Sequence, residues 1–293
     1  MKKILLATTL LAGSAGFASA DITWGGSAAA GIASNGTVNG GFTQAVIEGV
    51  VAPALPVHAD DKFETYSSVN LAVTFSGASD GGLTFGATFD MTAGTSYTLG
   101  NEDGFVDESG AFGMPTVFVE GSFGKLAISD DNYDFYDDTN AGGDAEYTGT
   151  FGAVNVGLIV DVDTNNASAK AGYTVGALAL NANIDTYNLW NVDAAYTLGS
   201  IVITAATDES SNSSIKVAYA ANGMSASAKY NTSDASVDLA AGYEANGITV
   251  AAETNTVTNE WTVTAAYDLG GGLSVEAGTN YTQDMMIGAK MAF

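Results

Sequence analysis

Residues 215–247 read IKVAYAANGMSASAKYNTSDASVDLAAGYEANG and contain two Asn-Gly pairs. Apolar Val217 and Tyr219 alternate with polar or small neighbours, and the same alternation leads through Leu239 to Tyr243. Period-two alternation is typical of a strand with one apolar face, and Asn-Gly between two such runs indicates a tight hairpin. The stretch therefore predicts consecutive antiparallel hairpins.

Aromatic residues recur at the same height of these predicted hairpins, once every 23 or 24 residues. The series consists of Tyr173, Tyr196, Tyr219, Tyr243 and Tyr267, each just before a turn, and Phe293 ends the last amphipathic strand. A second series, Tyr187, Trp190, Tyr230, Trp261 and Tyr281, marks the opposite strand ends. Aromatic rings collect at the two water–lipid interfaces of a membrane barrel. We interpret the first series as a membrane aromatic girdle and the second as a plausible partner to it.

A soluble β-sandwich would show the same alternation, so the size of the apolar residues decides between the two. Many of them are alanine, which is too small for a dense core but acceptable against fluid lipid. We therefore expect an all-β protein, a transmembrane antiparallel up-and-down β-barrel of 16–18 strands. The alternation yields eighteen candidate strands, and an even number lets the first strand pair with the last.

The first twenty residues carry the features of a secretory signal peptide. Lys2 and Lys3 precede the apolar run Ile4–Leu11, and Ala18-Ser19-Ala20 supplies a small-x-small cleavage site. A membrane anchor is the alternative, but the run is much shorter than the ~20 residues that a helix needs to span a bilayer. We predict a signal peptide over 1–20, one barrel domain over 21–293, and Sec-type export to the outer membrane.

Charge excludes nucleic acid as a partner. All eight basic residues are lysine; cleavage removes two of them and keeps all 33 acidic residues, which leaves a net charge of about −27. The chain has no cysteine, so its stability must come from hydrogen bonding and closure rather than from disulfides.

Several segments resemble the general porins of alphaproteobacteria. They are the opening DITWGG at 21–26, LTFGA at 83–87, VFVEGSFGKL at 117–126, the acidic segment after Ile128, and the final Met-Ala-Phe. The resemblance implies a trimeric outer-membrane barrel of sixteen strands, one hairpin fewer than the count above. It also implies that the third outer loop folds into the pore as a constriction.

The acidic segment 130–138 stands where that third loop is expected. Its candidate constriction residues are Asp130, Asp131, Tyr133, Asp134, Phe135, Asp137 and Asp138. An ordinary solvated loop is the plain alternative. A calcium loop of the EF-hand type is disfavoured, because Phe135 stands where that loop needs glycine and Ala141 where it needs glutamate.

The polar face of the strands supplies candidates for the pore wall: Lys125, Lys170, Lys216, Lys229, Lys290 and Glu120. A field between an acidic loop and a basic wall orients dipolar solutes. Because carboxylates outnumber ammonium groups, we expect the pore to prefer cations. The alternative is that the lysines are solvated residues without a special role.

Other loops carry weaker signals. The acidic pairs Glu102-Asp103 and Asp107-Glu108 could hold loosely bound Ca²⁺ that bridges to lipopolysaccharide or to a neighbouring subunit, or could simply keep a loop hydrated. The apolar segment 45–58 suggests a latch onto a neighbouring subunit, a cap or an irregular hairpin. The lone histidine, His58, has no neighbours that would make a catalytic site, and we expect neither enzyme activity nor a cofactor.

Two functions remain. The first is a passive channel for small hydrophilic solutes and ions, a homotrimer embedded in outer-membrane lipid and lipopolysaccharide. The second is a structural or adhesive barrel without an open pore. Short connections after residue 144 favour the channel, because adhesins more often display long outer loops.

Overall fold

The computed structural model describes residues 21–34, 46–47, 50–51, 63–99, 104–108, 110, 112–136 and 141–293. All regular elements in these ranges are strands. No helix among the described residues is long and apolar enough to cross a membrane. The predicted signal peptide, His58 and ten of the fourteen residues of segment 45–58 lie outside the described residues, so these predictions stay untested.

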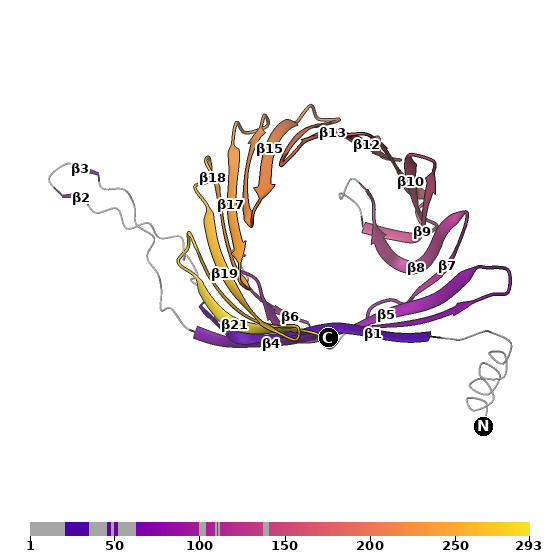
Figure 1. Cartoon of the computed structure of the whole chain (residues 1–293), viewed down its shortest axis with the longest axis horizontal. Coiled ribbons are helices and arrows are strands. Elements are labelled where there is room, and N and C mark those ends of the chain that lie inside the picture. The colour runs from indigo at the N-terminus through magenta and orange to yellow at the C-terminus, as the bar shows by residue number, and fades with distance from the viewer. Residues whose placement is uncertain are drawn as a thin grey trace, which may run out of the picture.

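The strands form an antiparallel barrel around an open interior (Figure 1). The eighteen wall strands are β1 (Asp21–Ser34), β4 (Phe63–Ala78), β5 (Thr84–Tyr97), β7 (Thr116–Gly121), β8 (Gly124–Asp134), β9 (Ala141–Phe151), β10 (Val154–Asp161), β11 (Asn166–Val175), β12 (Leu178–Asp185), β13 (Trp190–Leu198), β14 (Ile201–Asp208), β15 (Ser213–Ala221), β16 (Met224–Asn231), β17 (Val237–Ala245), β18 (Ile248–Asn255), β19 (Trp261–Gly270), β20 (Leu273–Asn280) and β21 (Met285–Ala292). Short β2 (Val46–Ile47) and β3 (Val50–Val51) pair with each other outside the wall.

The barrel closes because β1 pairs on both edges. One edge runs against β4 from Asp21↔Ser76 onward, and the other pairs with β21 from Ser27↔Ala292 to Ala33↔Met286. Phe293 completes the seam, since its backbone exchanges hydrogen bonds of 2.9 and 3.0 Å with Gly26. Closure leaves no sheet edge unpaired, which a strand surrounded by lipid requires. The all-β barrel predicted from the alternation is confirmed.

The strand number agrees with the alternation and exceeds the sixteen that the family resemblance implied. Each aromatic repeat adds one hairpin, and closure requires only that the total be even. An additional hairpin therefore widens the barrel without changing how its ends meet.

Tight turns at one end of the barrel set the register of the hairpins. Asn222-Gly223 joins β15 to β16 and Asn246-Gly247 joins β17 to β18, with φ between 51° and 79° at all four residues. Positive φ at both central residues is the signature of a type I′ turn, whose twist matches that of the flanking strands. The connections at the other end are longer, such as 232–236 and 256–260.

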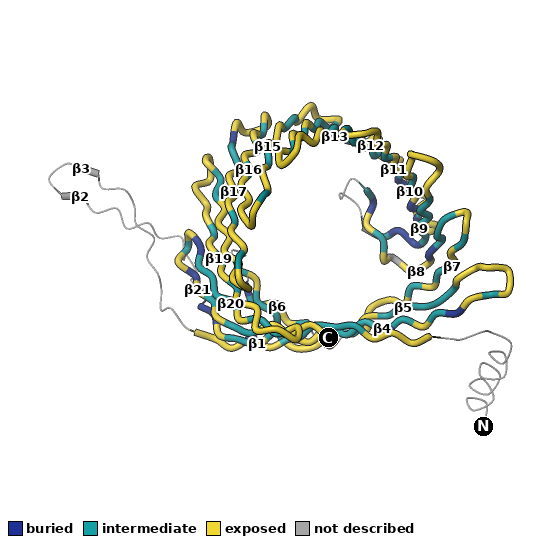
Figure 2. The backbone as a smooth tube through the Cα atoms, in the orientation of Figure 1, coloured by how far each residue is buried: buried dark blue, intermediate teal, exposed yellow. Residues whose placement is uncertain are grey.

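The wall is one sheet thick and has little packed core (Figure 2). Among the described residues the buried apolar side chains include Tyr66, Phe135 and Ile159. All three lie where a loop folds against the inner wall. Packing in this barrel is therefore concentrated beneath its inward loops.

Short β6 (Phe105–Asp107) pairs with the same edge of β5 as β7 does, farther along β5. Tyr97↔Phe105 and Thr95↔Asp107 pair in one register. The bridge Met91↔Phe112 is shifted by one residue from that register, and the pair Thr88↔Thr116 is shifted by one residue more. These shifts are bulges, which bend a strand and increase its twist. Asp107 and Glu108, which the sequence placed in a loop, thus lie beside β5, and Glu108 Oε1 accepts a 2.7 Å hydrogen bond from Ser96 Oγ.

Candidate functional site: the barrel interior

The inner and outer faces of the wall follow from the register. Starting from Lys125 on β8, directly paired residues share a face, and the chain of partners runs through Thr148, Gly157 and Lys170 to Asn183. Continued around the barrel, the same rule puts Lys216, Lys229, Lys290 and Glu120 on that face. This face is the inner one, because Lys170 Nζ lies over the ring of Tyr136, next to the β8–β9 hairpin that curves into the barrel (Figure 1). Glu120, Lys125 and Lys170 line a hollow of about 560 Å³ on it.

The aromatic girdle residues point the other way. Tyr173, Tyr196, Tyr219, Tyr243 and Tyr267 occupy the opposite face of their strands, and each is between 38% and 52% exposed. Phe293 is 64% exposed and lies against outward-facing Gly26. Large exposed rings in one band on the outside of a closed barrel are what a lipid interface stabilises. The role of these rings as a membrane girdle stays a prediction.

The third-loop segment, residues 129–136, leaves the wall and folds inward. From Lys125 to Ile128 the pairing of β8 with β9 is regular, but Tyr133 pairs with Gly143, which leaves extra residues on β8 between them. Such a bulge bends the strand. The hairpin consequently curves into the barrel interior (Figure 1). The sequence predicted a loop over 130–138, whereas β8 continues to Asp134.

Tyr136 fastens the third-loop segment to the inner wall. Its backbone N–H donates to Ser168 Oγ at 3.1 Å and its carbonyl accepts from Asn183 Nδ2 at 3.3 Å. The phenol donates to Glu146 Oε1 at 3.1 Å, and Lys170 Nζ lies 4.0 Å from the ring centroid. These partners come from β9, β11 and β12. The backbone and side chain of one residue thus join the loop to three strands of the wall.

The environment of Tyr136 keeps its phenol neutral. Burial, followed by the charge of Glu146 and the hydrogen bond to it, raises the pKa of Tyr136 above its ordinary value of 10.0. A neutral phenol donates a hydrogen bond to the carboxylate, and an ionised phenol would repel it. Next to it, Phe135 is only 3% exposed and supplies the apolar part of the anchor.

The predicted constriction residues have different positions. The side chains of Asp130 and Asp134 are exposed within the third-loop segment, that of Tyr133 is half-buried, and that of Phe135 is buried. Asp137, Asp138 and the side chain of Asp131 lie outside the described part of the chain. The docking residues Tyr136, Glu146 and Asn183 were missing from the predicted site. Tyr136 stood within the acidic segment, but no local pattern marks Glu146 or Asn183 as its partners.

A second inward contact, also missed from sequence, lies across the barrel. Tyr97, at the end of β5, stacks on Tyr66 with 5.7 Å between ring centroids and donates a 3.1 Å hydrogen bond to the carbonyl of Ser34. Phe105 packs on Tyr97 at 4.8 Å. A Cβ added to Gly278 of β20 would lie 2.8 Å from Leu99. Residues 97–99 and 104–105, here called the second-loop segment, therefore lie against β4, β1 and β20.

No group of three or more histidine, cysteine, aspartate or glutamate side chains arranged to hold a metal ion occurs among the described residues. Glu102 and Asp103 lie outside them. The predicted loose Ca²⁺ site at the acidic pairs stays a prediction.

Comparison with known proteins agrees with this architecture. The porin triple mutant of Rhodopseudomonas blastica is 12% identical, with a TM-score of 0.55 over 93% of this chain and 100% of that one. OpdQ of Pseudomonas aeruginosa is 10% identical, with a TM-score of 0.59 over 93% of this chain and 98% of that one. At this identity they show the fold alone.

Sequence comparison is more specific. A search of curated proteins found no match to the chain. The family model described as Gram-negative porin matches residues 7–284, which is nearly the whole chain. The protein therefore belongs to the Gram-negative porin family, as a non-enzymatic β-barrel channel of the outer membrane.

Proposed function

We propose that this porin is a general diffusion channel, water-filled and cation-preferring, for small hydrophilic solutes and ions. The observation that carries the proposal is the charge of the inner face. Five lysines face the interior, against a larger set of carboxylates on the same face: Glu120, Asp161, Asp185, Asp193, Asp238, Glu244, Glu253, Asp268 and Glu276. The register adds Asp90, Glu146 and Asp208 to this face. A surplus of fixed negative charge concentrates cations in a narrow aqueous path.

In this proposal the third-loop segment forms the constriction. Asp130 and Asp134 would supply negative potential from the loop, with Asp131, Asp137 and Asp138 contributing from its remainder. Lys125 and Lys170 would supply positive charge from the wall behind it. Two features support this role: the loop folds inward, and its carboxylates are exposed rather than paired within the described residues.

We also propose the homotrimer and the lipid contacts that the resemblance to alphaproteobacterial general porins implies. Supporting this is an outward hollow of about 460 Å³ lined by Ile32, Phe63, Val263, Met285 and Ile287, which is almost wholly apolar. Lipid, the acyl chains of lipopolysaccharide or a neighbouring subunit could fill it. Chemical cross-linking of the detergent-extracted protein, with and without heating, would distinguish a trimer from a monomer.

The test of the function is planar-bilayer conductance of the purified protein across a KCl gradient. Stepwise conductance with a reversal potential on the cation side would agree with the acidic pore, and steps in threes would agree with the trimer. Anion preference would refute the charge argument while leaving the channel. If folded, heat-modifiable protein conducted no current, the alternative function, a structural or adhesive barrel, would remain.

A further inference from the structure

Among the described residues, neither inward loop contacts the inner wall along β15–β19. Tyr136 of the third-loop segment contacts β9, β11 and β12, and the second-loop segment contacts β4, β1 and β20. Besides the hollow at Glu120, Lys125 and Lys170, two adjoining inward hollows of about 480 and 440 Å³ lie along β15–β19. A solute that crosses the barrel has open space along this third wall. Its residues should therefore act on the solute directly.

Two ammonium groups stand side by side on this wall. Lys216 of β15 pairs directly with Lys229 of β16, and both side chains line the 440 Å³ hollow. Like charges directly opposite each other on neighbouring strands repel. An anion placed between them would relieve that repulsion and accept hydrogen bonds from both.

The neighbouring carboxylate Asp238 is held by amide groups rather than by the two lysines. Asp238 is the direct cross-strand partner of Lys229, yet its oxygens accept hydrogen bonds from Asn231 at 2.8 Å and from Asn255 at 2.7 Å. Within the described residues neither Lys216 nor Lys229 forms an ion pair. Both ammonium groups are thus available to a solute.

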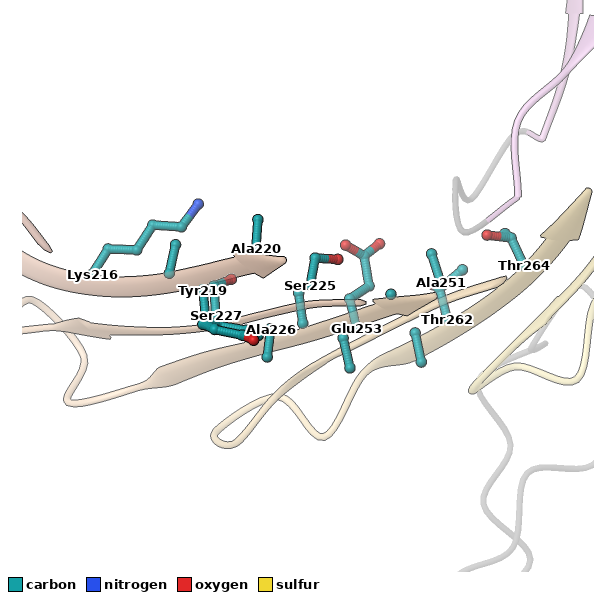
Figure 3. A pocket seen from close by; sticks show the side chains of 15 residues that line it. Lys216, Tyr219, Ala220, Ser225, Ala226, Ser227, Ala251, Glu253, Thr262 and Thr264 are labelled. Carbon is teal, nitrogen blue, oxygen red and sulfur yellow. The ribbon is translucent and has the colours of Figure 1, made fainter. Parts of the chain in front are cut away.

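A free carboxylate shares the hollow with the lysines. Glu253 of β18 is exposed, lines the same two hollows and points to the same side of the sheet as Lys216 (Figure 3). Glu253 lies two strands away from Lys229, about 10 Å across the sheet, and is displaced by two residues, about 7 Å, along the strand direction. Long side chains from both positions can reach toward one small molecule between them.

We propose that Lys216, Lys229 and Glu253 form a solute subsite that selects small zwitterions of the amino acid class. The carboxylate of the solute lies between the two ammonium groups, and its ammonium group faces Glu253. The subsite raises the local concentration of such solutes over uncharged ones of equal size. This inference rests on the proposed function, because it needs an open channel.

The experiment compares two isomeric solutes of equal size, β-alanine and the uncharged lactamide, by the swelling rate of liposomes that contain the purified porin. Both carry no net charge at neutral pH, so no membrane potential develops. The wild-type porin should admit β-alanine faster. The double variant Lys216→Gln/Lys229→Gln should lower the ratio of the two rates at least threefold, and Glu253→Gln should lower it in the same direction.

Lys290→Gln is the matched control, because Lys290 faces the interior from β21, away from this wall. It should leave the ratio unchanged. An unchanged ratio in the double variant, or an equal loss in Lys290→Gln, would overturn the subsite while leaving a working channel. No swelling with either solute in the wild type would instead refute the proposed function. Heat-modifiable mobility of every variant verifies that it has folded.

Discussion

Replacing Tyr136 with alanine should release the third-loop segment from the wall. The substitution removes the hydrogen bond to Glu146, the contact with Lys170 and the packing of the ring. A hydrogen bond to a charged acceptor contributes about 1.5 kcal/mol, and a cation–π contact at a wet site contributes about 0.5–1 kcal/mol. With the ring packing added, the loss is about 3 kcal/mol, a factor of about 100 in the docking equilibrium. The two backbone hydrogen bonds to Ser168 and Asn183 need no phenol and should persist.

Single-channel recording measures this release directly. The Tyr136→Ala variant should show a larger mean conductance and more open-channel noise, because a mobile loop no longer blocks the same part of the lumen. Tyr136→Phe removes only the hydroxyl and should show an intermediate effect. Tyr219→Ala is the control, since it makes the same truncation on the outer face. If Tyr136→Ala conducted with the wild-type amplitude and noise, the anchoring role derived for Tyr136 would be wrong.

Other predictions concern pH and backbone geometry. Burial and Glu146 raise the pKa of Tyr136, so docking of the third-loop segment should be unaffected below pH 10 and should weaken as pH rises through the raised pKa. Open-channel noise should then increase in the wild type but not in Tyr136→Phe. Gly288→Ala should destabilise the barrel by about 1–3 kcal/mol in urea titrations, since the new Cβ would clash with the Tyr66 hydroxyl and lie 2.8 Å from the backbone oxygen of Ala30. A stability equal to wild type would contradict this packing. Gly223→Ala should lower the free energy of unfolding by about 1 kcal/mol or more and slow refolding into detergent, because φ of Gly223 is 75° and the new Cβ would approach the carbonyl of Glu244. Unchanged refolding would argue against the type I′ turn.

The inward loops show where prediction from sequence ended. The acidic composition and aromatic residues of 130–138 suggested a loop that could pack against the wall, and the family resemblance placed it inside the pore. Which aromatic residue docks depended on Ser168 and Asn183, more than thirty residues farther along the chain. The second-loop segment had no comparable signal, since Tyr66, Tyr97 and Gly278 are ordinary residues of their strands. Their contact exists only because closure brings β20, β1, β4 and β5 together.

Local rules were sufficient for the wall of the barrel. Alternation assigns each residue of a strand to one of two faces, and Asn222-Gly223 and Asn246-Gly247 set the register of their hairpins, so the inner lysines and the outer tyrosines could be assigned from sequence alone. Tertiary structure decided which inward groups meet. It set Tyr136 beside Glu146 and Lys170, and it left Lys216 and Lys229 uncovered on the third wall. The physical reason is that period-two patterning specifies the direction of a side chain, whereas curvature, closure and the bulge in β8 determine its distance from residues on other strands.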